Sequence, residues 1–297
     1  MHRLRTGLRH LRRLTTFLFA TLLLAAPATA KVALWKIDDG DTKIWLLGTI
    51  HALPAKVKWH SPAIDQAIGS AHELVLETVV DHDPQKTTAL IMSLGTATTA
   101  PPIADRIAAG KRPALAAMIA ETKVPVAVFD RLKTWAAAFL LVGLTVRDAI
   151  GDSNMTGVES QLSENFAASK RPISGLETSA QQLGFFNTLS EEEQRRFLED
   201  TVDTGKTAKS DFKAMLRAWL KGDDKAIAKS FSTEEDISPV LREILIRKRN
   251  IAWADWLARR LEQPGQLLVA VGAGHLAGPD SVQKQLAKRG IKVTRVE

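Results

Sequence analysis

Apolar runs near both ends of the chain predict a β-sheet. Two β-prone runs flank Asp39-Gly40-Asp41, a turn signal typical of a hairpin. Ser61-Pro62 then predicts the start of a helix, and a further strand follows it, which is the βαβ pattern of a parallel sheet. A second strand and helix pattern occurs near the C-terminus. The predicted strands cover residues 32–38, 42–50, 73–80, 172–177, 266–271 and 291–296.

Helical spacing dominates the middle of the chain, from about residue 84 to residue 262. Residues 134–146 are strongly apolar but shorter than the ~20 residues that span a bilayer, so we expect a buried core helix. Ser190 and Glu193 have the spacing of a capping box. The pattern therefore predicts an α/β fold, with a mixed, mostly parallel sheet built from both chain ends, flanked by helices, and a large helical middle section.

The first thirty residues are predicted to be a secretory signal peptide, residues 1–30. Five arginines precede an apolar stretch over 14–26, and Ala28-Thr29-Ala30 is a small-x-small cleavage site. Residues 31–297 would then form a single domain, periplasmic or secreted, with no stable membrane span. Removing the segment leaves 35 basic and 33 acidic residues, so the charge does not indicate a nucleic-acid partner. The chain has no cysteine, which excludes thiolate ligands and a cysteine nucleophile.

Two Gly-x-x-His turns, Gly48 to His51 and Gly272 to His275, each follow a predicted strand. Ligands bind beyond the carboxyl ends of strands in open α/β sheets, so we expect both histidines to meet at one sheet edge. Gly48, Gly272 and Gly274 would allow the sharp loops. Imidazole is a common ligand of zinc, manganese and cobalt, so the pair predicts one divalent metal ion. Two bonds of ~2.1 Å to that ion require imidazoles within about 7 Å of each other.

A lone acid within an apolar strand is costly to bury unless a partner compensates its charge. Glu77 is such an acid, which makes it the natural third ligand. The βαβ connection predicts that its strand lies next to the strand that ends before His51. Glu77 would be either a ligand or the base that deprotonates water. Arg249 and Asn250 interrupt an apolar helix face and could stabilise an oxyanion or a substrate carbonyl.

Other interpretations of these residues stay open. Either histidine alone could cap its loop through backbone hydrogen bonds, and for Glu159 and Glu177 we expect helix capping rather than a place in the cleft. Residues 272–278, with Glu297 beyond them, resemble a dinucleotide fingerprint whose last glycine comes one residue late. No Gly-x-Ser-x-Gly elbow occurs, which disfavours a serine hydrolase.

Short motifs in a set order connect the candidates. They are Leu47-Gly48-Thr49-Ile50-His51, Leu74-Val75-Leu76-Glu77, Gly157-Val158-Glu159, Gly175-Leu176-Glu177-Thr178 with Gln181 or Gln182, Arg249-Asn250, Val271-Gly272-Ala273-Gly274-His275-Leu276-Ala277-Gly278 and Gly290-Ile291-Lys292-Val293. Together they resemble the TraB/PrgY/GumN family, from about Trp35 to the C-terminus. That family is related to the Tiki proteases and to the erythromycin-esterase and ChaN folds.

The resemblance implies a metal site and, by analogy with Tiki, metal-dependent peptide cleavage. It places His51, Glu77 and His275 at the metal and Arg249 with Asn250 at a polar pair, while Glu159 stands where aspartate is more usual. The expected function is an exported metal-dependent hydrolase acting on a peptide or protein substrate. The alternative is a binding protein that sequesters a peptide or small ligand in the same cleft without turnover.

Overall fold

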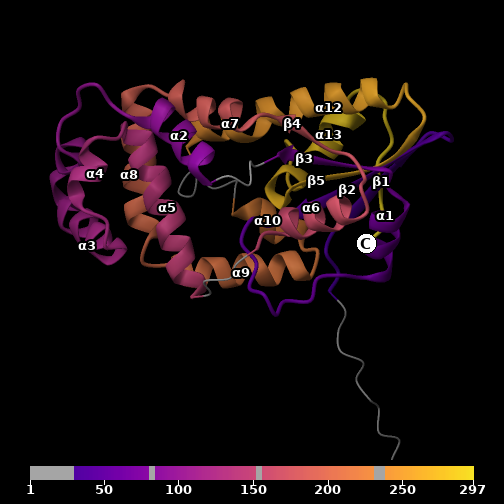
Figure 1. The fold of residues 1–297 in the computed structure, drawn as a ribbon, viewed down its shortest axis with the longest axis horizontal. Helices are drawn as coiled ribbons and strands as arrows, with labels where there is room; N and C mark the ends of the chain where they lie inside the picture. Colours follow the sequence, from indigo (N-terminus) through magenta and orange to yellow (C-terminus); the bar gives the residue numbers. More distant parts are fainter. Residues whose placement is uncertain (1–29, 80–83, 152–155, 231–237) are drawn as a thin grey trace, which may run out of the picture.

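A six-stranded mixed sheet with helices on both faces lies beside a lobe made only of helices (Figure 1). The computed structural model describes residues 30–79, 84–151, 156–230 and 238–297. The predicted α/β class, with strands from both chain ends, is confirmed. Apart from Ala30, the predicted signal peptide lies outside the described residues.

The strand order in the sheet is β4-β3-β5-β2-β1-β6. Neighbours from β4 to β2 pair in parallel, whereas β1 pairs antiparallel with β2 and with β6. The strands are β1 (Leu34–Asp38), β2 (Thr42–Thr49), β3 (Glu73–Thr78), β4 (Ile173–Glu177), β5 (Gly265–Gly272) and β6 (Thr294–Arg295).

Most of the helices lie between β3 and β5, where only β4 interrupts them, while α1 precedes β3 and η4 and α13 follow β5. They are α1 (Pro62–Ser70), α2 (Pro84–Gly95), η1 (Ile103–Arg106), η2 (Ala109–Lys111), α3 (Arg112–Thr122), α4 (Val126–Asp130), α5 (Thr134–Ile150), α6 (Val158–Ala168), α7 (Ser179–Asn187), α8 (Glu191–Thr204), α9 (Ala208–Leu220), α10 (Asp224–Lys229), α11 (Pro239–Arg242), the π-helical turn η3 (Glu243–Arg247), α12 (Lys248–Arg260), η4 (Ala273–Leu276) and α13 (Val282–Ala287).

One prediction about the sheet is wrong, and one predicted strand is shorter than expected. The strand that carries Glu77 does not lie beside β2, because β5 pairs with both and separates them. The βαβ connection through α1 therefore skips one position in the sheet. The strand expected over 291–296 pairs with β1 only at Thr294–Arg295, at the exposed sheet edge.

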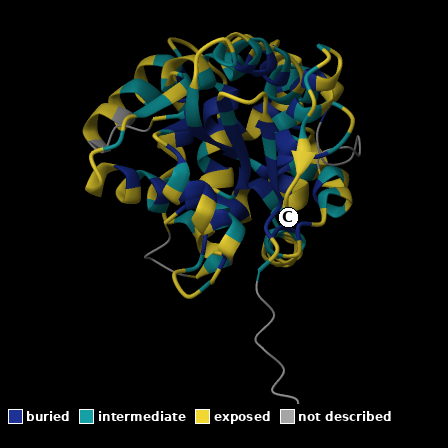
Figure 2. Ribbon diagram, turned by 90° about the vertical axis from the view of Figure 1, so that its right-hand side faces the viewer, coloured by how far each residue is buried: buried dark blue, intermediate teal, exposed yellow. Residues whose placement is uncertain are grey.

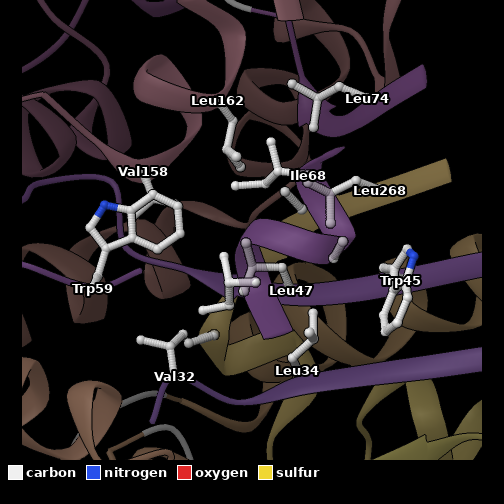
Figure 3. Close-up of a cluster of buried hydrophobic side chains, with 14 of the residues drawn as sticks. Val32, Leu34, Trp45, Leu47, Trp59, Ile68, Leu74, Val158, Leu162 and Leu268 are labelled. Atoms are coloured by element: carbon white, nitrogen blue, oxygen red, sulfur yellow. The ribbon is translucent and has the colours of Figure 1, made fainter. Parts of the chain in front are cut away.

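Alternating side chains along the strands build one core on each face of the sheet. Leu47, Leu74 and Leu268 pack on the first face, beneath α1, α6 and α9 (Figure 3). Leu46 and Val269 pack on the opposite face, beneath α12 and α13. The strands β1, β2, β3 and β5 are consequently mostly buried, whereas β4 is partly buried and β6 is exposed (Figure 2).

The helical lobe has its own core, formed mainly by α3, α5 and α8. Trp135 and Leu141 of α5 are fully buried in it, in keeping with the predicted core helix. Within the described ranges, no helix is long and apolar enough to cross a membrane. The capping box is only half formed: Ser190 Oγ accepts from the Glu193 N–H, but the Glu193 carboxylate accepts from Ser238 instead.

Candidate functional site

The two strands that carry the Gly-x-x-His turns are neighbours that run parallel and end in register. Thr49 of β2 pairs with Gly272 of β5, so His51 and His275 both emerge beyond the same sheet edge. Glu77 comes from β3 on the other side of β5. Its side chain lies on the same strand face as that of Val75, which packs in the core beneath α12. The carboxylate is thereby directed toward α12.

Gly272 lies between the three side chains. A Cβ added to it would lie 3.0 Å from Glu77 Oε1 and 3.7 Å from both His51 Nε2 and His275 Cδ2. His51 Nε2 and His275 Cδ2 therefore lie at most twice 3.7 Å apart, an upper limit slightly above the separation of about 7 Å within which two imidazoles could share one ion. Gly48, Gly272 and Gly274 all have φ outside the positive range, so none of these loops depends on the left-handed conformation that glycine allows. Close packing accounts for Gly48 and Gly272 instead, because a Cβ on Gly48 would lie 3.3 Å from Ala273 Cα.

Glu77 is buried and fully hydrogen-bonded. Its Oε1 accepts from the Gly272 N–H at 2.6 Å, and its Oε2 accepts from Arg249 Nη2 at 2.8 Å and from Gln182 Nε2 at 3.2 Å. Burial alone would raise the pKa of Glu77, but it is outweighed by His275, which is charged only near the low pH at which Glu77 titrates, and by the permanent charge of Arg249, so the pKa is lowered to about 2. Glu77 is therefore an anion at neutral pH.

Arg249 of α12 bridges two buried carboxylates and a histidine. Its Nε donates to Glu177 at 3.0 Å, and its Nη1 donates to His275 Nε2 at 3.1 Å. Trp253 Nε1 also donates to Glu177, at 2.9 Å, and so fixes the carboxylate that holds the guanidinium. The expectation that Glu177 caps a helix is wrong, because its carboxylate is taken up by Arg249 and Trp253, while Thr178 caps α7.

His275 is held in one neutral form. Asn250 Nδ2 donates to the carbonyl oxygens of His275 and Asp280, which leaves Asn250 Oδ1 to accept from His275 Nδ1–H at 2.6 Å. Complete burial lowers the pKa of His275 to about 3, against the opposing effect of Glu77. The Nε2 lone pair faces Arg249 and Glu77, the latter at 3.6 Å. Asn250, itself fully buried, orients His275 and is not open to a substrate.

His51 is paired with Glu159 from the first turn of α6. His51 Nδ1 lies 2.8 Å from Glu159 Oε1, which also accepts from the Thr49 hydroxyl. The hydrogen bond to Glu159 raises the pKa of His51 to about 9, although 73 % of the side chain is exposed in the open cleft. Glu159 thus reaches the cleft, contrary to the capping expectation. Gly157 permits this approach, because a Cβ there would lie 2.6 Å from the His51 carbonyl oxygen.

Two features of the donor set suit a divalent cation. Glu159 holds Nδ1 of His51 and Asn250 holds Nδ1 of His275, so Nε2 of each histidine faces the site. Metal-binding histidines are commonly oriented in this way by a hydrogen bond to their other ring nitrogen. The carboxylates of Glu77, Glu159 and Glu177 outnumber the cationic groups, so net negative charge remains. The hydrogen bond from Arg249 Nη1 to His275 Nε2 must nevertheless break before that nitrogen can bind an ion. In the described part of the chain, no three His, Asp or Glu side chains stand close enough to hold a metal as they are.

A cavity of about 550 Å³ opens above these groups, where the helical lobe meets the sheet edge. One end presents His51, Glu77, Glu159 and Arg249. The other end is apolar and is contributed by the helical section. Its lining side chains are Phe139, Leu183, Phe185, Phe186, Leu245 and Ile246.

The glycine-rich segment over 272–278 does not support the dinucleotide alternative. It forms the short turn η4, and α13 begins only at Val282, so no helix N-terminus follows the glycines directly. His275, inside the segment, is buried against Asn250. The loop therefore serves the histidine centre.

Comparisons with known proteins agree with the motif pattern. The protein described as "Uncharacterized protein YbaP" of Escherichia coli (strain K12) is 26% identical over 170 residues, which cover 56% of this chain and 61% of that protein. The protein of the same description from Shigella flexneri matches to the same extent, so the chain spans less than two thirds of either relative. No solved structure matches significantly. The profile of the TraB/PrgY/gumN family matches residues 33–295, and the chain belongs to the TraB/PrgY/gumN family.

Proposed function

We propose that the protein is a hydrolase that cleaves peptide bonds with the help of a divalent manganese, cobalt or zinc ion. The observation that carries the proposal is the convergence of His51, Glu77 and His275 on the space beside Gly272. These three side chains would hold the ion. When bound, the ion would polarise the scissile carbonyl and lower the pKa of a bound water.

The residues of the chain would divide the remaining work. Glu77, whose pKa is lowered to about 2, suits a ligand better than a base. Arg249 is the nearest permanent cation and would stabilise negative charge on the carbonyl oxygen during attack. Asn250 would keep His275 Nε2 directed at the site. In the overall reaction the water oxygen bonds to the carbonyl carbon, the C–N bond breaks, and a water proton ends on the leaving amine.

Export is part of the proposal and is supported by the pattern of residues 1–30. The basic start, the apolar stretch and the small-x-small end are typical of a secretory signal. The hydrolase would therefore act in the periplasm or outside the cell, on peptide substrates found there.

A second candidate is a binding protein that holds a peptide without cleaving it. Arg249 favours this alternative, because it already compensates Glu77 and occupies His275 Nε2 without an ion. Such a site would bind the carboxylate of a ligand through the exposed His51 cation beside the guanidinium, whose N–H groups are already donated, and would need no metal.

Mass spectrometry of a peptide library distinguishes the two functions. The purified protein is incubated with the library and manganese, cobalt or zinc, and is compared with His51→Ala, His275→Ala and the control His72→Ala, which changes an exposed histidine outside the site. Circular dichroism verifies that each variant is folded. Cleavage that requires metal and both site histidines, but not His72, supports the hydrolase. Peptide binding without cleavage under every metal would rule it out in favour of the binding protein.

A further inference from the structure

The apolar end of the cavity is a surface that the proposed chemistry does not use. Six uncharged side chains form it, and we call them the apolar wall: Phe139, Leu183, Phe185, Phe186, Leu245 and Ile246. They come from α5, α7 and η3, whereas His51, Glu77 and His275 come from the sheet edge. The wall and the charged residues thus belong to different parts of the fold and face one cavity.

The wall begins next to the charged groups. The Phe185 ring centroid lies 5.8 Å from the guanidinium carbon of Arg249, and the Leu245 carbonyl accepts from Arg249 Nη1 at 3.0 Å. Consecutive Cα atoms in a peptide are about 3.8 Å apart, so a carbonyl at Arg249 and a neighbouring side chain at Phe185 are compatible with one short segment. One ligand can therefore contact both ends of the cavity.

Phe139 is the most accessible part of the wall. It is 40% exposed, a large fraction for a phenylalanine, and it lines the cavity. Phe186 meets its ring edge-on at a centroid distance of 5.6 Å and is itself stacked on Trp135 and Phe197 at 5.9 and 5.6 Å. The inner part of the wall is thereby fixed by the core of the helical lobe, while the Phe139 ring remains available to a ligand.

We infer that the cavity binds peptides with a large apolar side chain, of phenylalanine or leucine size, beside the bond held at Arg249. The apolar wall removes that side chain from water, and the charged end holds the adjacent carbonyl. The volume of about 550 Å³ suits a short segment of a few residues. This inference rests on the proposed function for the identity of the ligand as a peptide, and it assigns specificity to the helical section.

The test uses blocked peptides, acetyl-Ala-Ala-X-Ala-Ala-amide, with X as Phe, Leu, Ser or Asp. Calorimetry measures binding to the full folded protein, and mass spectrometry measures cleavage separately in the presence of zinc or manganese. Three variants are compared with the wild type: Phe139→Ser, Phe139→Leu, and Val126→Ser. Val126 is also exposed and apolar, but it lies on α4 and outside the cavity lining.

The wild type should bind the Phe and Leu peptides at least about tenfold more tightly than the Ser and Asp peptides, as is usual for an apolar pocket. Phe139→Ser should remove most of that preference, whereas Phe139→Leu and Val126→Ser should keep it. Equal binding of all four peptides, or an unchanged preference in Phe139→Ser, overturns the inference. Selective binding without cleavage would instead count against the hydrolase and leave the apolar specificity standing.

Discussion

Replacing Gly272 by alanine tests whether His51, Glu77 and His275 share one ion. The φ of Gly272 is −50°, which alanine adopts without strain, so the backbone should not change. The added methyl would lie 3.0 Å from Glu77 Oε1, about 0.5 Å inside an ordinary contact of roughly 3.5 Å, and 3.7 Å from His51 Nε2. Such crowding costs about 1–3 kcal/mol, partly offset by the lower entropy of the unfolded alanine chain.

The expected result is a folded protein with a modest loss in the free energy of unfolding and a metal affinity lowered at least about tenfold, equivalent to about 1.4 kcal/mol. Calorimetric titration with zinc or manganese and urea unfolding measure the two quantities. Gly48→Ala is the matched control, because its methyl would meet Ala273 Cα at 3.3 Å, a similar crowding whose nearest atoms belong to Ala273 and Leu276 and not to His51, Glu77 or His275. If folded Gly272→Ala binds the ion as tightly as the wild type, the three side chains do not share it.

Two further predictions concern the charged groups of the site. Arg249→Met leaves the buried carboxylates of Glu77 and Glu177 uncompensated, and should lower the free energy of unfolding at pH 7 by about 3–5 kcal/mol, with a smaller loss in Arg249→Lys. The pKa of Glu77 is lowered to about 2 from 4.5, so the difference in free energy of unfolding between the wild type and Arg249→Met should be full above pH 4.5 and shrink as the pH falls toward 2. A difference in unfolding free energy that does not depend on pH contradicts this prediction. Glu159→Gln should lower the pKa of His51 from about 9 toward ~6.5 in an NMR titration of the metal-free protein. The stability contributed by the His51 and Glu159 pair is present below pH 6.5 and is lost as the pH rises through 9. If the titration midpoint of His51 is the same in Glu159→Gln as in the wild type, another group sets the pKa of His51.

The sequence was sufficient to predict that both Gly-x-x-His turns lie at one edge of the sheet. Apolar runs and turn signals are local features, and both Gly-x-x-His turns follow strands whose ends do lie in register. The isolated acid in an apolar strand was also informative, because Glu77 is buried with Arg249 as its compensating charge. These predictions depend only on the residues within a short stretch of the chain, not on which distant segments pack against it.

The order of the strands and the partners of the acids could not be predicted in the same way. Nothing local to β2 or β3 indicates that β5 pairs between them, because that choice depends on long-range packing. For the same reason Glu159 and Glu177 resemble helix-capping residues, although their carboxylates hold His51 and Arg249. The available signal was that Glu177 ends its strand, and Glu77 lies one residue before the end of its own, at the edge where the histidines lie.

The central place of β5 has a consequence for how the protein matures. β5 pairs with both β2 and β3, yet the whole helical section separates it from them along the chain. Contacts between such distant segments form late and slowly, because a long loop must be closed first. His51 and Glu77 therefore precede β5 along the chain, but Glu77 contacts the Gly272 N–H and the His275 imidazole only once β5 has inserted between β2 and β3. The folding order itself keeps the site incomplete until the sheet is closed.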